Sequence, residues 1–186
     1  GISNAIASTV QMNLANVAGV SFDLNNLAQT VGRLSGGGTT GGNITLGSAT
    51  LTVNQATSTT TYSGIISGTG GLTKTGAAAL SLGGLNTYTG PTTISAGTLQ
   101  AIVDNVIQNS SELIMANVAT AIFNQNGTSQ IIGSLSGGGA TGGNISLGAG
   151  TLTITQNTAG TYDGVISGPG NIIKLGTDTL TLTRTN

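Results

Sequence analysis

Charged side chains are scarce in this 186-residue sequence, and histidine, cysteine and tryptophan are absent. Charged residues make up only 5% of the chain, against about 25% in an ordinary globular domain. Without cysteine there are no disulfides, thiolate nucleophiles or soft metal sites. Without histidine there is no histidine-based triad and no imidazole ligand for a metal. The sequence predicts no catalytic, metal-binding or cofactor-binding residues, and no cofactor.

The acidic residues do not gather into a candidate active site. Glycosidases need two carboxylates about 5–10 Å apart, and calcium-binding roll repeats need an aspartate in each turn. The acidic residues here are far apart in the sequence: Asp23, Asp104, Glu112, Asp163 and Asp178. We therefore predict that the chain is not an enzyme.

The basic residues are equally sparse, and the formal net charge is −1. They are Arg33, Lys74, Lys174 and Arg184. No basic patch is present to neutralise phosphates or anionic lipids, which argues against nucleic acid and against a polybasic membrane contact. No apolar run approaches the ~18 residues that span a bilayer, so these residues are not expected to insert into a membrane.

What the chain does have is an internal repeat. Residues 34–55 return as residues 135–156, an offset of 135 − 34 = 101, and residues 61–76 return as 161–176, an offset of 100. Such self-similarity is typical of repeat proteins. We predict a single domain made of two homologous units, residues 1–101 and 102–186. The second unit is incomplete, because it stops at Asn186, the counterpart of Asn86.

Short segments alternate Leu, Val or Ile with Thr or Ser. The clearest lie at residues 49–53, 79–82, 151–155 and 179–185, with glycine clusters between them. Alternation predicts half-buried strands, and glycine clusters predict tight corners. A repeat of such units predicts an all-β parallel β-solenoid of about eight or nine rungs, with an extended surface rather than a pocket. Residues 102–118 also fit an amphipathic helix, but we favour a turn followed by a strand at 112–115.

Residues 71–101 carry a recognisable pattern. Glycine, leucine and lysine positions at 71–82 precede the string NTYTG at 86–90 and the string TISAGTL at 93–99. This pattern resembles the autotransporter-associated β-strand repeat, or passenger-associated transport repeat, of Gram-negative passenger domains. Ala78 and Pro91 stand where that family usually has glycine. The resemblance implies a right-handed parallel β-helix that is displayed on, or released from, a bacterial surface.

Several single residues support structural expectations. The tyrosines Tyr62, Tyr88 and Tyr162 are expected to pack at corners with solvated hydroxyls, the alternative being an exposed carbohydrate-binding surface. The equivalent residues Phe22 and Phe123 are expected in the core. Lys74 and Lys174 are expected to lie exposed on strands and to oppose edge-to-edge aggregation. Asp163 is close enough in sequence to pair with Lys174.

The function that we expect is a non-enzymatic, surface-exposed stalk or adhesin segment of an autotransporter-like passenger, on the outer surface of a Gram-negative bacterium. Its partner would be a ligand on a host or neighbouring cell. The alternative is a self-assembling extracellular fibre subunit that associates through the ends of the solenoid. Ice binding is a minor alternative, suggested by alternating threonines at Thr151, Thr153 and Thr155 and at Thr179, Thr181 and Thr183.

Overall fold

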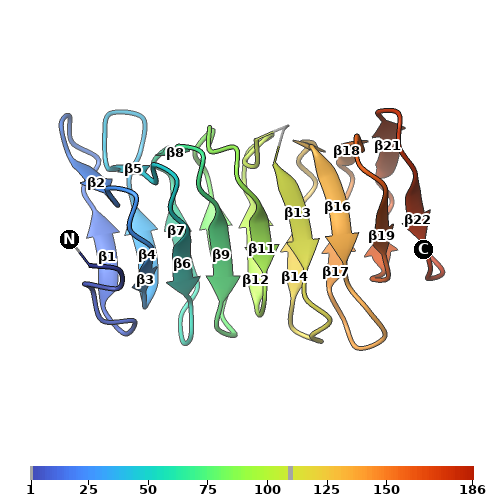
Figure 1. Ribbon diagram of the computed structural model, residues 1–186, viewed down its shortest axis with the longest axis horizontal. Coiled ribbons are helices and arrows are strands. Elements are labelled where there is room, and N and C mark those ends of the chain that lie inside the picture. The colour runs from blue at the N-terminus through green and yellow to red at the C-terminus, as the bar shows by residue number, and fades with distance from the viewer. Residues whose placement is uncertain (1, 109–110) are drawn as a thin grey trace.

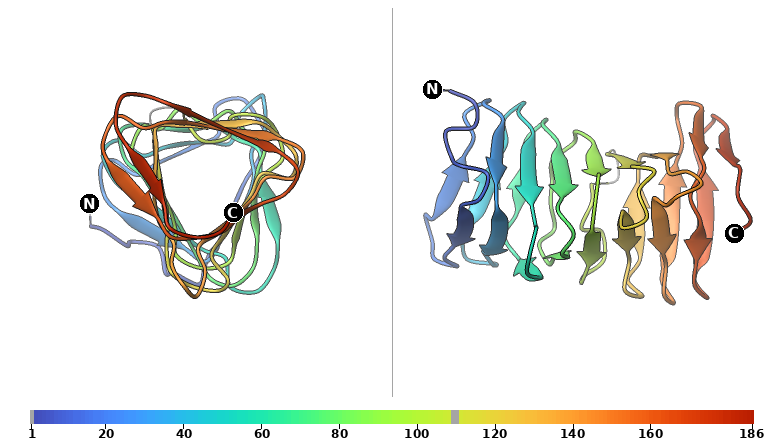
Figure 2. Two further views of the ribbon diagram at one scale, coloured as in Figure 1. Left: turned by 90° about the vertical axis from the view of Figure 1, so that its right-hand side faces the viewer. Right: turned by 90° about the horizontal axis from the view of Figure 1, so that it is seen from below.

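The computed structural model describes residues 2–108 and 111–186, which coil into a parallel β-solenoid (Figure 1). Each turn of the coil, here called a rung, passes through three faces, so that the cross-section is triangular (Figure 2). Two of the faces are sheets of eight strands each, one strand per rung. The strand pairs within all the sheets are parallel. The predicted fold class and number of rungs are confirmed.

The faces are numbered in the order in which the chain visits them. Face 1 contains β1 (Gln11–Leu14), β4 (Arg33–Gly36), β7 (Thr60–Tyr62), β10 (Leu80–Leu82), β12 (Thr98–Ala101), β14 (Ile122–Asn124), β17 (Asn144–Ser146) and β20 (Ile166–Ser167). Face 2 contains β2 (Ser21–Asp23), β5 (Asn43–Thr45), β8 (Ile66–Ser67), β15 (Gln130–Ile132), β18 (Thr151–Thr155) and β21 (Asn171–Leu175). Face 3 contains β3 (Gln29–Val31), β6 (Leu51–Asn54), β9 (Leu72–Thr75), β11 (Thr92–Ile94), β13 (Glu112–Met115), β16 (Ser134–Gly137), β19 (Gly160–Tyr162) and β22 (Leu180–Leu182).

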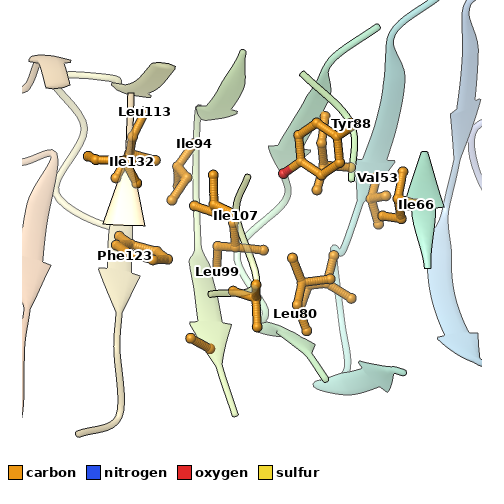
Figure 3. Close-up of a cluster of buried hydrophobic side chains, with 14 of the residues drawn as sticks. Val53, Ile66, Leu80, Tyr88, Ile94, Leu99, Ile107, Leu113, Phe123 and Ile132 are labelled. Carbon is orange, nitrogen blue, oxygen red and sulfur yellow. The ribbon is translucent and has the colours of Figure 1, made fainter. Parts of the chain in front are cut away.

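The buried hydrophobic side chains form one cluster inside the coil, here called the core column, and Figure 3 shows part of it. Successive side chains of a strand point to opposite sides, so one half of each strand faces the column. In β6, Leu51 and Val53 are fully buried, whereas Thr52 and Asn54 face outward and are half-buried. Phe123 is fully buried and Phe22 is half-buried against the same cluster, so the predicted core placement of both rings is confirmed.

The predicted strands are confirmed at β6, β10, β18 and β22. The segment that also fitted a helix forms the strand β13 at Glu112–Met115, as favoured, and its described residues contain no helix. Residues 109 and 110 lie outside the described part of the chain.

On face 2, hydrogen bonds from side chains take the place of strand pairing in the rungs that form no strand there. Between β8 and β15 two rungs pass through this face without forming a strand. There the Asn86 amide accepts from Ile66 N at 2.8 Å and donates to Val106 O at 2.8 Å. The Gln130 amide in turn accepts from Val106 N at 2.9 Å. These buried amides carry the rung-to-rung bonding across the gap between the two short sheets of face 2.

The two sequence units do not occupy equivalent faces. β1 lies on face 1 of the first rung, and its counterpart β13 lies on face 3 of the fifth rung, paired with β11 and β16. Similarly β14, the counterpart of β2, lies on face 1 instead of face 2. One unit therefore takes four turns plus two-thirds of a turn, and equivalent residues of the two units point in different directions.

Gln125 is a polar defect in the core. It is fully buried at the position of Leu24 in the first unit, and neither polar atom of its amide has a hydrogen-bond partner in the part of the chain that the structure describes. We expect Gln125→Leu to raise the free energy of unfolding by about 1–3 kcal/mol, because it removes an unpaired buried amide.

Urea denaturation of the two proteins measures this change, and Gln156→Leu is the matched control. The equally buried Gln156 amide accepts from Leu135 N at 3.1 Å and donates to Thr158 O at 2.8 Å, so its loss should destabilise the solenoid. Equal effects of the two substitutions would contradict the prediction.

Candidate functional site

The acidic side chains do not converge on one site. Each of three accepts a local hydrogen bond: Asp23 from Asn25 N at 2.8 Å, Asp104 from Ser129 N at 2.8 Å and Glu112 from the Ser136 hydroxyl at 2.6 Å. Within residues 2–108 and 111–186, no three acidic side chains are close enough together to hold a metal ion. These carboxylates fix turns and neighbouring rungs in place.

Asp163 pairs with Arg184, and the predicted pairing with Lys174 is wrong. The Arg184 Nε lies 3.1 Å from the Asp163 carboxylate, and Thr183 also donates to it. These two donors hold the pKa of the Asp163 carboxyl below its usual range. The pair is solvent-exposed at the last rung, so it contributes little to stability.

All three tyrosines are fully buried. The prediction that their hydroxyls are solvated is therefore wrong, and so is the alternative of an exposed aromatic surface. The Tyr62 hydroxyl donates to Gly42 O at 2.7 Å, and the Tyr162 hydroxyl donates to Gly143 O at 2.6 Å. The Tyr88 hydroxyl lies 2.6 Å from the Thr92 hydroxyl. A tyrosine can turn inward here because a backbone or side-chain oxygen inside the coil receives its hydroxyl.

Burial of the tyrosines has a consequence at alkaline pH. It raises the pKa of Tyr88 to about 12 and also raises those of Tyr62 and Tyr162. An unfolded tyrosine ionises near pH 10. Above that pH the unfolded state releases protons that the folded state keeps, so the tyrosines lower the free energy of unfolding as the pH rises.

We therefore expect tyrosinate absorbance to appear together with the loss of β-structure in circular dichroism. A tyrosinate titration near pH ~10 with unchanged circular dichroism would contradict the buried placement.

Lys74 is a buried cation that joins two rungs. Its side chain is fully buried, and Nζ donates to Thr75 O at 2.7 Å, Gly76 O at 2.7 Å and Ala96 O at 3.0 Å. Ala96 belongs to the next rung, and a Cβ added at Gly97 would lie only 2.7 Å from Nζ. Burial lowers the pKa of Lys74 to about 8. The expected exposed position on the sheet is therefore wrong for Lys74.

The equivalent Lys174 is exposed, as expected, and lies on the last rung. Its Nζ donates to Gly176 O at 2.9 Å, which repeats one of the bonds made by Lys74. The two equivalent lysines thus differ in whether another rung covers them.

The most regular outward-facing feature is a column of hydroxyl side chains along face 3, here called the hydroxyl ladder, whose members are half-buried except for the exposed Thr161 and Thr181. It consists of Thr30, Thr52, Thr73, Thr93, Ser136, Thr161 and Thr181, with Ile114 between Thr93 and Ser136. Its first four threonines are direct partners on successive rungs, spaced about 4.8 Å apart. The two threonine runs noted in the sequence lie on different faces, since β18 is on face 2 and β22 is on face 3.

A shallow apolar groove lies at the corner between faces 1 and 2. It encloses about 240 Å³, and its two large apolar side chains are Ile65 and Leu85. The rest of its lining is Gly38, Thr39, Ser63, Gly83 and Gly84. Ile65 is 38% exposed and Leu85 is 62% exposed. Exposed apolar surface of this kind is typical of interaction sites, so the groove offers a contact for an apolar group on the side of the solenoid opposite the hydroxyl ladder.

The family model of the passenger-associated-transport-repeat matches residues 72–101. The chain carries this repeat of autotransporter passengers. The matched residues run from β9 to β12 and contain Lys74, its three carbonyl acceptors and the pair of Tyr88 and Thr92. The repeat therefore coincides with the part of the core in which the Lys74 ammonium is held between two rungs.

A longer stretch is similar to a named autotransporter. The chain is 42% identical over 166 residues, 86% of its length, to the adhesin BmaC autotransporter of Brucella suis biovar 1 (strain 1330), and it spans 5% of that protein's length. No solved structure matches the chain. In the described residues no helix is long and apolar enough to cross a membrane. The resemblance to an autotransporter passenger with associated repeats is confirmed.

Proposed function

We propose that this chain is a non-enzymatic stalk or adhesin segment of an autotransporter-like passenger, exposed on the surface of a Gram-negative bacterium. The observation that carries the proposal is the 42% identity to a protein named an autotransporter adhesin, over most of this chain. The fold supports it, because stacked rungs present a long exposed face and need no pocket. A ligand on a host or neighbouring cell would contact either the hydroxyl ladder on face 3 or the apolar groove between faces 1 and 2.

Antibody labelling tests the exposure. Antibodies raised against the 186-residue chain should label intact bacteria that produce it, and prior treatment with an external protease should remove the label. Labelling that requires permeabilised cells would contradict a surface role.

Competition distinguishes an adhesin segment from a stalk. If the chain contacts a receptor, the purified protein should bind host cells saturably and reduce bacterial adhesion. A Leu85→Asp variant, which places a carboxylate in the apolar groove, should then lose this effect, and Thr87→Asp on the same exposed stretch is the control. If the chain is exposed on the surface but the purified protein does not reduce bacterial adhesion, only the stalk role is supported.

The fibre alternative stays a proposal with a test of its own. Electron microscopy of the purified chain should show subunits joined end to end in filaments if it is correct, and isolated rods would contradict it. Ice binding is less favoured, because the column beside the hydroxyl ladder is not uniformly threonine but includes Asn54, Ser95 and Ala116. Thermal hysteresis above that of buffer would revive ice binding.

A further inference from the structure

A polar hollow, here called the arginine notch, lies at the corner between faces 3 and 1. It encloses about 230 Å³ and is lined by residues from three successive passes of the chain through this corner. Thr9 precedes β1, Gly32 lies between β3 and β4, and Thr57 precedes β7. The chain therefore bounds the notch on both sides of Gly32 along the solenoid axis, and the notch lies on the flank of the solenoid.

The shape of the notch follows from the glycine at its base. Gly32 is the single residue between β3 and β4, and its N–H donates to Val10 O at 2.7 Å. A Cβ added at Gly32 would lie 2.5 Å from the carbonyl carbon of Thr9, so no side chain can fill this corner. The next pass, between β6 and β7, is a wider loop with exposed residues at 56–59. A tight corner beside a wide one leaves the hollow.

The polar side chains of the notch make few hydrogen bonds within the chain. Arg33 is half-buried and donates through Nη2 to Gln11 Oε1 at 2.5 Å. Among the described residues it has no carboxylate partner, since the ion pair that they form is between Arg184 and Asp163. A guanidinium has five N–H donors, so most of those on Arg33 remain available to a ligand.

The other polar side chains of the notch are also available. In the part of the chain that the structure describes, their side chains make no hydrogen bond to another residue; they are Ser8, Thr9, Asn54 and Thr57. Three of them are hydroxyls and one is an amide, so each both donates and accepts. The notch thus surrounds one cation with neutral groups of mixed hydrogen-bonding character.

The second unit shows that the corner folds without an arginine. Its equivalent glycine, Gly133, donates to Ser111 O at 2.8 Å, yet Ser134 occupies the position of Arg33. The strand partner of Arg33 is Gln11, whereas the strand partner of Ser134 is Glu112. The first unit therefore places a cation at this corner and the second unit a carboxylate, so Arg33 is not required by the fold and its charge is particular to the first unit.

We propose that the arginine notch binds the carboxylate of an acidic monosaccharide through the Arg33 guanidinium. The planar fork of an arginine matches the two oxygens of a carboxylate, and the hydroxyl and amide groups around it match the hydroxyls of a sugar. The volume of about 230 Å³ is below the ~300–1,000 Å³ of pockets for drug-sized ligands, so it suits one sugar residue. The inference gives the proposed adhesin segment a ligand class, and its biological role rests on that proposal.

An NMR titration of the purified 186-residue chain with glucuronate tests the proposal. We expect saturable shifts of the amide signals of Gly32 and Arg33, and at least tenfold weaker binding by Arg33→Ser, which introduces the residue that the second unit has. Arg184→Ser removes an exposed arginine far along the chain and should bind like the wild type. A titration without shifts at Gly32 and Arg33, or an Arg33→Ser protein that binds like the wild type, would overturn the proposal.

Two further probes separate the sugar from its charge. Glucose lacks the carboxylate and should not bind, and inorganic sulfate lacks the sugar hydroxyls and should bind at least tenfold more weakly than glucuronate. Sulfate that binds as tightly as glucuronate would identify an adventitious ion only and would overturn the saccharide site. Equal binding of glucose would overturn the role of Arg33.

A second variant keeps the arginine and neutralises its charge. Gln11→Glu introduces the carboxylate that the second unit carries beside this corner, and it should weaken glucuronate binding at least tenfold with unchanged circular dichroism. Undiminished binding by this variant would overturn the proposal. Loss of the notch as a site, together with surface labelling of intact bacteria, would leave the stalk role in place. Binding of glucuronate by a chain that antibodies do not label on intact cells would support the notch and contradict the surface role.

Discussion

Replacing Gly137 with alanine is expected to lower the free energy of unfolding by roughly 3–5 kcal/mol. Gly137 ends β16 with φ at +85°, a left-handed conformation that costs other residues about 1–2 kcal/mol. An added Cβ would also lie 2.1 Å from Met115 O of the neighbouring rung. Relieving that overlap moves one rung away from the next, and overpacking of this kind costs about 1–3 kcal/mol or more.

Gly127→Ala is the control that separates backbone conformation from crowding. Gly127 has nearly the same φ, +80°, but the atom nearest to its added Cβ is 3.8 Å away. We expect this variant to lose only about 1–2 kcal/mol. Chemical denaturation of both proteins measures the difference, and equal losses would show that the close stacking of rungs at Gly137 is not what limits the side chain there.

Replacing Lys74 with alanine is expected to cost about 2–4 kcal/mol. The change leaves the carbonyls of Thr75, Gly76 and Ala96 without their shared donor and leaves a cavity in the core. Removing a buried ammonium offsets part of the loss. Lys174→Ala, at the equivalent but exposed position, should change the free energy of unfolding by less than about 0.5 kcal/mol at a protein concentration that keeps the chain monomeric.

The pH dependence of the free energy of unfolding is an independent test of the burial of Lys74. Its pKa is lowered to about 8 in the folded protein, whereas an unfolded lysine keeps its proton to about pH 10.4. Between these values the unfolded state binds more protons, so the free energy of unfolding rises with pH in that window. Lys74→Met should abolish the rise. A rise that persists in the variant would mean that Lys74 is not buried as a cation.

Much of the fold could be predicted from local patterns, because alternation and glycine corners are encoded within a few residues. Residues 151–155 illustrate this, since both the strand and its orientation follow from the sequence. The buried positions of Lys74 and Tyr62 could not be predicted. Their polar atoms are satisfied by Ala96 O and Gly42 O, backbone groups about 20 residues away that come close only once the coil has formed.

The exposed surface was the least predictable part. The hydroxyl ladder takes no more than one residue from any rung, so no contiguous sequence motif predicts it. Equivalent sequence segments also turned out to lie on different faces, because one unit contains a fractional number of turns. A partner that binds along one face therefore meets non-equivalent residues of the two units, and the sequence repeat is no guide to a repeated binding site.

Engineered disulfides test this arrangement most directly, since the natural chain has no cysteine to compete. Thr93 and Ile114 are direct partners on β11 and β13, the pair that places the second unit on face 3. Cα atoms of such partners lie about 5 Å apart, within the range that a disulfide requires. The protein carrying Thr93→Cys and Ile114→Cys should form an intramolecular disulfide under mild oxidation, and the protein carrying Gln100→Cys and Ile114→Cys should not. The reverse result would place β13 on face 1, beside β12, and would contradict the fractional-turn solenoid.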